Sequence, residues 1–137
     1  MAAFDTTRTA YGSTSAVTRI LGFFGAFFAA VEVAQANVDA NNLSGRVACV
    51  EAAGFDHPQL AEAAPFDLVF ANILKGPLVA LAPDMAGALQ PAGYAILSGL
   101  LNEQADEVIE VYARSGIKLV HRESIGDWTT LTLQTNG

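Results

Sequence analysis

The sequence is poor in cysteine, histidine and basic side chains, and each shortage argues against a class of function. The single cysteine, Cys49, lies in the apolar run at 47–50, so no disulfide framework can form within the chain and a buried structural thiol is expected. The two histidines, His57 and His121, have no partners at metal-site or triad spacing, so no metal is expected. Seven Lys and Arg stand against fourteen Asp and Glu, a net charge of −7. This charge repels phosphates, which argues against direct nucleic-acid binding, and it attracts a basic protein partner.

Long apolar runs are also missing. A transmembrane helix needs roughly 20 apolar residues, and the run ILGFFGAFFAAV at 20–31 is much shorter. We therefore expect no membrane partner. The length does suit the apolar region of a secretory signal, and Ala34-Gln35-Ala36 fits a small-x-small cleavage site. A small exported domain is one interpretation of this run, and a buried core helix or strand is the other.

What the sequence does contain is a large share of apolar residues. Hydrophobic residues make up 52% of the chain and charged residues 15%. This composition excludes a disordered chain. It fits a parallel α/β core, in which buried strands are apolar runs without alternation. A chain of 137 residues is enough for one such core.

Hydrophobic periodicity and turn residues predict strands that alternate with helices after residue 31. Asn102 is the expected N-cap of the last helix, with acidic residues following it and Gly116 ending it. This alternation predicts a parallel sheet with right-handed crossovers, closed by an antiparallel hairpin. The expected order is helix 31–42, strand 46–52, helix 58–63, strand 66–71, helix 73–90, strand 93–99, helix 102–115 and a hairpin over 118–134 that turns at Gly126-Asp127.

Ligands of open parallel sheets bind beyond the carboxyl ends of the strands. Three segments qualify, at 51–54, 71–74 and 98–101. Asn72 directly follows a strongly apolar strand, and its side-chain oxygen can accept a hydrogen bond from a substrate amine. Alternatively, Asn72 satisfies backbone groups at a turn, and the neighbouring Lys75 either lines the mouth of the site or points to solvent.

Four segments, taken in order, resemble a known family. They are VEVAQANVDANNL at 31–43, DLVFANILKGPLVALAPDMAGAL at 67–89, PAGYAILSGLLNEQADEVIEVY at 91–112 and SGIKLVHRESIGDWTTLTL at 115–133. The second is similar to the D-x-V-x-A-N-I-L-x-x-P-L segment of the class I methyltransferases that act on ribosomal protein L11. The third and fourth are similar to the L-S-G-I-L stretch and to the closing G-E-W-x-x-L hairpin of the same family.

This resemblance implies a fold, a reaction and a site. The fold would be a Rossmann-like α/β methyltransferase sheet, mostly parallel, with a closing antiparallel hairpin. The cofactor would be S-adenosylmethionine, and the methyl acceptors would be lysine ε-amino or α-amino groups of a ribosomal protein in the cytoplasm. Asn72 would be the catalytic residue and would contact the methionine end of the cofactor, with Ala71 and Ala52 as further cofactor contacts.

The N-terminal segment departs from the family pattern. No glycine-rich D-x-G-x-G turn occurs in residues 1–30, and the acid that binds the cofactor ribose in the family aligns with Phe27-Phe28. We therefore divide the chain into an atypical segment, 1–30, and the C-terminal part of a catalytic domain, 31–137. The first cofactor-binding strand is expected to be missing unless residues 20–30 rebuild it. A frame disruption upstream of Val31 would explain the abrupt onset of resemblance.

Two consequences of this departure are open at the level of sequence. A sheet without its first strand would expose apolar surface and promote self-association. The chain is then either a methyltransferase by ancestry that is weak or inactive as this chain, or a non-catalytic remnant of one.

Overall fold

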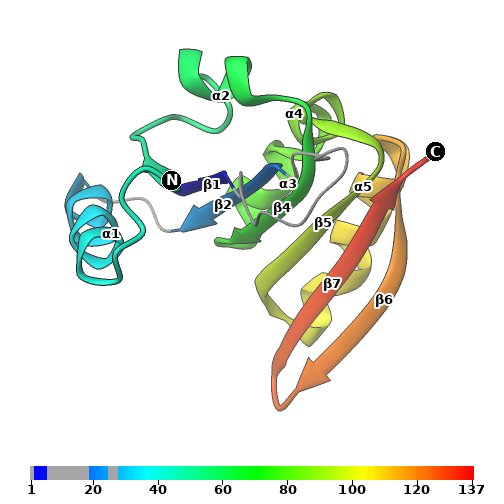
Figure 1. Ribbon diagram of the computed structural model, residues 1–137. Coiled ribbons are helices and arrows are strands. Elements are labelled where there is room, and N and C mark those ends of the chain that lie inside the picture. Colours follow the sequence, from blue (N-terminus) through cyan, green and yellow to red (C-terminus); the bar gives the residue numbers. More distant parts are fainter. Residues whose placement is uncertain (1, 6–18, 25–27) are drawn as a thin grey trace, which may run out of the picture.

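The computed structural model describes residues 2–5, 19–24 and 28–137, and within these residues the strands form one sheet flanked by helices (Figure 1). The strand order is β3-β1-β2-β4-β5-β7-β6. The strands are β1 (Ala2–Asp5), β2 (Arg19–Phe24), β3 (Val47–Cys49), β4 (Phe66–Asn72), β5 (Leu89–Leu101), β6 (Ile117–Ile125) and β7 (Trp128–Thr135). The helices are α1 (Phe28–Ala40), α2 (Pro58–Ala63), α3 (Lys75–Ala80), α4 (Ala82–Ala88) and α5 (Ala105–Arg114), the last preceded by a 3₁₀ turn at Asn102–Gln104.

The sheet is mixed, and its centre is parallel. β2 pairs with β4 and β4 pairs with β5 in parallel, whereas β5, β7 and β6 are joined by antiparallel pairings. β1 runs antiparallel to both of its neighbours, β2 and β3, so β3 has the same direction as β2, β4 and β5. The predicted fold class, a Rossmann-like α/β sheet with a closing antiparallel hairpin, is confirmed.

A strand does lie at the position where we expected a gap. β2 pairs with β4 from Ile20↔Leu68 to Phe24↔Asn72, and α1 begins shortly after it. The physical reason is that β4 would otherwise expose a row of unpaired backbone groups, and the β-prone sequence RILGFF supplies partners for them. The first strand is thus rebuilt from residues 19–24, without the glycine-rich motif. Of the apolar run at 20–31, residues 20–24 lie in β2 and residues 28–31 lie in α1, whereas residues 25–27 lie outside the described residues.

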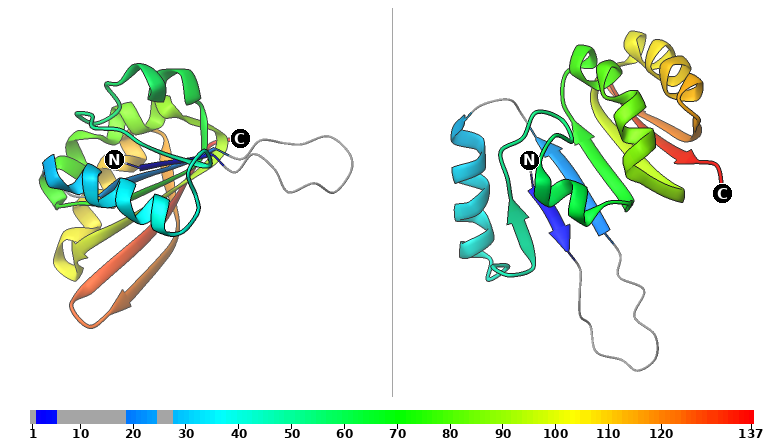
Figure 2. Two further views of the ribbon diagram at one scale, coloured as in Figure 1. Left: turned by 60° about the vertical axis from the view of Figure 1, so that its left-hand side comes forward. Right: turned by 90° about the horizontal axis from the view of Figure 1, so that it is seen from above.

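The hydrophobic core lies between one face of the sheet and the helices α2 to α5. Val69 and Ala71 of β4, Leu97 of β5 and Leu131 of β7 are almost fully buried against these helices. Figure 2 shows α4 and α5 together on this side of the strands. Tyr112 of α5 is buried and donates a hydrogen bond from its hydroxyl to the carbonyl of Leu78 in α3 (2.9 Å), which joins the two helices.

Most predicted helices and strands are present within a few residues of their expected limits. The helix expected over 73–90 is divided at Leu81 into α3 and α4, because Pro83 has no N–H group with which to continue the hydrogen-bond ladder. Within the described residues, none of the helices has both the length and the apolar character required to cross a bilayer.

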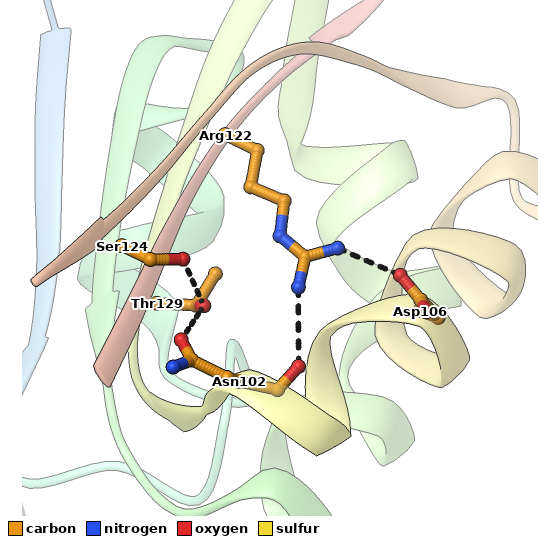
Figure 3. A network of polar contacts seen from close by, with 5 residues as sticks. All are labelled: Asn102, Asp106, Arg122, Ser124 and Thr129. Atoms are coloured by element: carbon orange, nitrogen blue, oxygen red, sulfur yellow. Dashed lines mark hydrogen bonds and ion pairs between the residues drawn. The ribbon is translucent and has the colours of Figure 1, made fainter. Parts of the chain in front are cut away.

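The assignment of Asn102 as the N-cap of α5 is wrong. Asn102 instead begins the 3₁₀ turn, and its side chain is directed toward the β6–β7 hairpin (Figure 3). Its Nδ2 donates to the carbonyl of Gly126 (2.8 Å), and its Oδ1 accepts from the buried hydroxyl of Thr129 (2.6 Å). A tertiary contact has therefore replaced the local cap, since a buried threonine hydroxyl needs a partner more than an exposed helix end does.

Candidate functional site

The carboxyl ends of β2, β4 and β5 lie in register at one edge of the sheet. Phe24 is paired with Asn72, and Asn72 with Ser98. Asn72 is the last residue of β4, and its side chain is exposed while the preceding Ala71 is buried. The carboxamide of Asn72 is thus presented at the edge where ligands of such sheets bind.

Gly99 controls how closely β5 approaches this carboxamide. Its φ of +80° is a left-handed conformation that glycine adopts without strain. A Cβ atom at this position would lie 2.9 Å from Asn72 Oδ1 and 3.1 Å from the carbonyl oxygen of Ile73. Residue 99 must therefore be glycine for Asn72 to keep its place. Sequence reasoning overlooked Gly99, although a glycine inside a strand often marks a close approach of backbone.

The two other predicted cofactor contacts lie in different surroundings. The side chain of Ala71 is buried in the core, so only its backbone can face the edge. Ala52 is half-buried and follows β3, whose direction places it at the same edge as Asn72. Three strand spacings separate β3 from β4 in the sheet, about 14 Å. A ligand that touched both Ala52 and Asn72 would have to be elongated.

Lys75 is engaged in an ion pair and does not extend freely over the edge. Its Nζ lies 2.7 Å from Glu107 Oε2, which links the start of α3 to α5. Two other acidic residues of α5 also have partners, since Asp106 pairs with Arg122 (2.7 Å) and Glu110 with Arg114 (2.9 Å). The acidic face of α5 is therefore a set of exposed surface pairs, each contributing about 0–1 kcal/mol.

A polar network fixes the hairpin to the end of β5 (Figure 3). The hydroxyl of Thr129 lies between Asn102 Oδ1 (2.6 Å) and Ser124 Oγ (2.9 Å). Arg122 donates to the carbonyl of Asn102 (3.1 Å) in addition to its ion pair with Asp106. These contacts hold the end of the hairpin at the same edge of the sheet as Asn72.

The histidines and the cysteine have structural surroundings. His57 is the N-cap of α2 and accepts a hydrogen bond at Nδ1 from the backbone N–H of Gln59 (3.2 Å), whereas His121 is exposed on β6. Burial raises the pKa of the half-buried Cys49 thiol, which disfavours a reactive thiolate. In the part of the chain that the structure describes, no three His, Cys, Asp or Glu side chains are grouped as a metal site would require.

A sequence model of the family described as ribosomal protein L11 methyltransferase (PrmA) matches residues 28–136. The chain belongs to this family. The L11 methyltransferase of Mesorhizobium japonicum is 42% identical over 105 residues, and that of Chelativorans sp. is 44% identical over 108 residues. Each match covers 77% of this chain and 36% of the relative, so the chain spans about a third of the length of these L11 methyltransferases.

Solved structures share the fold at lower identity. The L11 methylase of Lactobacillus delbrueckii subsp. bulgaricus matches with a TM-score of 0.69 and 21% identity, over 88% of this chain and 59% of that one. An O-methyltransferase family protein of Burkholderia thailandensis matches with a TM-score of 0.66 and 18% identity, over 88% and 44% of the two chains. The S-adenosylmethionine-dependent methyltransferase SibL matches with a TM-score of 0.59 and 15% identity, over 85% and 42%. The expected cofactor, S-adenosylmethionine, agrees with membership of this family.

The residues at the edge suit one end of that cofactor better than the other. Asn72 offers an acceptor and two donors, which match the carboxylate and amine of an amino acid. At the end of β2, the sequence RILGFF has no carboxylate to accept hydrogen bonds from ribose hydroxyls, and none follows before Glu32. Asn72 is therefore chemically suited to the amino-acid end of the cofactor, whereas the sequence at the end of β2 offers no acidic residue for the ribose end.

Proposed function

We propose that this chain carries the amine-binding half of an S-adenosylmethionine-dependent protein methyltransferase site, with Asn72 at its centre. The proposed acceptors are lysine ε-amino or α-amino groups of a ribosomal protein, and the proposed compartment is the cytoplasm. The observation that carries this proposal is the exposed carboxamide of Asn72, held against the backbone of Gly99 at the ligand edge of the sheet.

The proposed role of Asn72 is to orient the attacking amine. When bound, the cofactor supplies a methyl group on a reactive sulfonium. What the protein must add is position, because the nitrogen lone pair has to point along the line of transfer. Asn72 Oδ1 would accept a hydrogen bond from the neutral amine, and Asn72 Nδ2 would donate to an acceptor of the cofactor's amino-acid end. Backbone groups of Ala71 and Ala52 complete the proposed contacts along the edge.

The acidic surface supports a basic protein substrate. Thirteen of the fourteen carboxylates follow residue 31, and ribosomal proteins that bind RNA are basic. The chain would therefore attract such a substrate electrostatically and would repel RNA.

Calorimetric titration of the full chain with S-adenosylmethionine tests the proposal. We expect weak but saturable binding, since each unmet ribose hydrogen bond costs on the order of 1–3 kcal/mol. Asn72→Ala should abolish the heat, while Asn37→Ala, which removes an exposed carboxamide from α1, should leave it unchanged. Transfer of a labelled methyl group from the cofactor to ribosomal protein L11 would then establish the activity.

The competing function is a non-catalytic remnant of the same family, favoured by the missing acid and glycine-rich turn. It predicts no heat of binding even at millimolar cofactor. The proposed boundary at residue 30 bears on the same question. If translation of the upstream DNA in the other two frames reveals a D-x-G-x-G segment, the atypical residues 1–30 are a frame-disrupted start of a methyltransferase gene.

A further inference from the structure

One face of the sheet has no described helix packed over its central strands. Residues of β4 and β5 that point away from the core are paired across the strands as Leu68↔Tyr94 and Phe70↔Ile96. None of these four side chains belongs to the main core or packs against it, although Val69 and Ala95 beside them are fully buried there. Parallel strands are normally covered on both faces, and here α3, α4 and α5 all lie on the other side (Figure 1).

The same face continues across the hairpin. Register places Thr130 and Thr132 of β7 and Glu123 of β6 on it, and Ile125 is paired with Trp128 at its end. We call this surface the open face. It includes Leu68, Phe70, Tyr94, Ile96, Leu101, Lys118, His121, Glu123, Ile125, Trp128, Thr130, Thr132 and Gln134. The next pair in the same alternation, Asn72↔Ser98, lies at the border of this face, at the ligand edge of the sheet.

The open face holds several of the large apolar side chains that solvent reaches. Phe70 is 37% exposed, Tyr94 40%, Trp128 58% and Ile125 75%. Aromatic side chains of this kind dominate the buried centres of protein interfaces. The hairpin that carries Trp128 and Ile125 is held by the network around Thr129, so these two side chains are presented on a rigid support.

The charge of the open face favours a second copy of this chain as its partner. The chain as a whole carries −7, yet this face has one lysine, Lys118, and one glutamate, Glu123, and so has no net charge at neutral pH with His121 neutral. A basic peptide would find no excess of carboxylates here, and an anionic membrane would meet an acidic molecule. A surface with both signs and an apolar centre is complementary to itself, which is what an isologous interface requires.

We propose that the open face is the interface of a homodimer, in which two copies of this chain pack sheet against sheet. Burying this face removes apolar and aromatic side chains from water at a surface that carries no net charge, so two acidic molecules can approach there without local repulsion. Packed sheets lie about 10 Å apart, a distance that these side chains fill.

The single tryptophan of the chain makes the test direct, because Trp128 lies on the open face. Sedimentation velocity over a range of concentrations should show a monomer–dimer equilibrium, and the emission of Trp128 should move to shorter wavelength as the dimer forms. Tyr94→Glu and Tyr94→Lys should each raise the dimer dissociation constant at least about 100-fold, since a two-fold axis buries the unpaired charge twice. The lysine variant separates two causes of dissociation. It lowers the net negative charge of the chain, so dissociation of the dimer in this variant cannot result from greater overall repulsion and must result from the buried charge.

Leu119→Glu is the matched control. Leu119 is 40% exposed, as is Tyr94, but it pairs with the buried Leu133 and points to the helix-bearing side. It should leave the dimer intact. Circular dichroism of each variant verifies folding, and Thr132→Arg at the centre of the face replaces any Tyr94 variant that fails to fold. A monomer at all concentrations, or dissociation by Leu119→Glu as readily as by Tyr94→Glu, would overturn the proposal. Co-purification of a different polypeptide on this face, with no dimer, would also overturn it.

Discussion

At position 99 the backbone leaves room for a hydrogen atom and nothing larger. Two constraints coincide there, a positive φ and the contact of β5 with the Asn72 carboxamide. The predicted site therefore depends on a residue that carries no chemistry of its own. The position of Asn72 could be predicted, because an apolar strand followed by a polar residue marks a strand end. The contact between Gly99 and the Asn72 carboxamide could not be predicted, because the two residues are distant in sequence.

Gly99→Ala should destabilise the fold by about 2–4 kcal/mol, from the strained φ and the displacement of Asn72. Gly116 is the matched control, because its φ of +86° is similar and no atom lies within 4 Å of where its Cβ would be. Gly116→Ala should cost only about 1–2 kcal/mol for the strained φ. Urea denaturation measures both free energies of unfolding. Equal losses for the two variants would show that the contact with Asn72 has no energetic weight.

Tyr112 should make the protein sensitive to alkali. Burial raises the pKa of Tyr112 above its ordinary value of 10.0, so the unfolded chain loses this proton at a lower pH than the folded chain does. The stabilisation that the neutral, buried Tyr112 side chain provides is complete below pH 10. Above pH 10 the free energy of unfolding should fall by up to about 1.4 kcal/mol per pH unit.

Tyr112→Phe isolates this effect. At pH 7 the variant should be about 1 kcal/mol less stable, because the hydrogen bond to the carbonyl of Leu78 is lost. Above pH 10 the difference should shrink and then reverse. Urea denaturation of both proteins from pH 7 to 11 tests this prediction. A difference in the free energy of unfolding that stays constant over the whole pH range would contradict it.

At the scale of elements, the closing hairpin is positioned by side chains as well as by the strand ladder. Thr129→Val preserves shape and removes both contacts of the buried hydroxyl, leaving Asn102 Oδ1 unpaired. We expect a loss of about 1–3 kcal/mol. Thr130→Val is the control, since no side-chain hydrogen bond is found for this half-buried neighbour among the described residues. A loss of stability as large in Thr130→Val would mean that the network contributes nothing.

The order of helices and strands could be predicted from hydrophobic periodicity. The residues at which individual helices begin and end depend on single side chains and were predicted less well. The strand over 66–71 and the closing hairpin were predicted correctly because apolar runs and turn residues are local signals. The break between α3 and α4 was missed, although Pro83 marks it. Asn102 was misassigned because its partners Thr129 and Gly126 lie on the hairpin, and no local pattern indicates a tertiary hydrogen bond.

For the whole molecule, charge should govern the response to salt. The net charge of −7 opposes the compact state, and screening relieves this repulsion. The ion pairs of Lys75, Arg114 and Arg122 are partly or largely exposed and lose little on screening. Tm should therefore rise between about 0.02 and 0.5 M NaCl, at fixed protein concentration. A fall in Tm would show that these pairs outweigh the net repulsion.

The topology of the whole sheet was predicted only from residue 31 onward. Alternating strands and helices determine how β4, β5 and the hairpin are connected, because crossovers have a fixed hand. The fixed hand of crossovers does not determine where β1 and β2 lie in the sheet. Their place in the sheet depends on which edge needs hydrogen-bond partners, and this is a property of the assembled strands and not of the local sequence.

The direction of β1 has a consequence for repairing the site. Because β1 runs antiparallel, its last residue, Asp5, is paired with Arg19 at the start of β2, and Ala2 lies beside Gly22 near the end of β2. The direction of this strand therefore places Asp5, its only acidic residue, toward the edge of the sheet opposite Asn72. An engineer who wished to restore an acid for ribose hydroxyls would gain nothing from Asp5. The substitution belongs at the amino end of β1, at Ala2, where the same strand reaches the ligand edge.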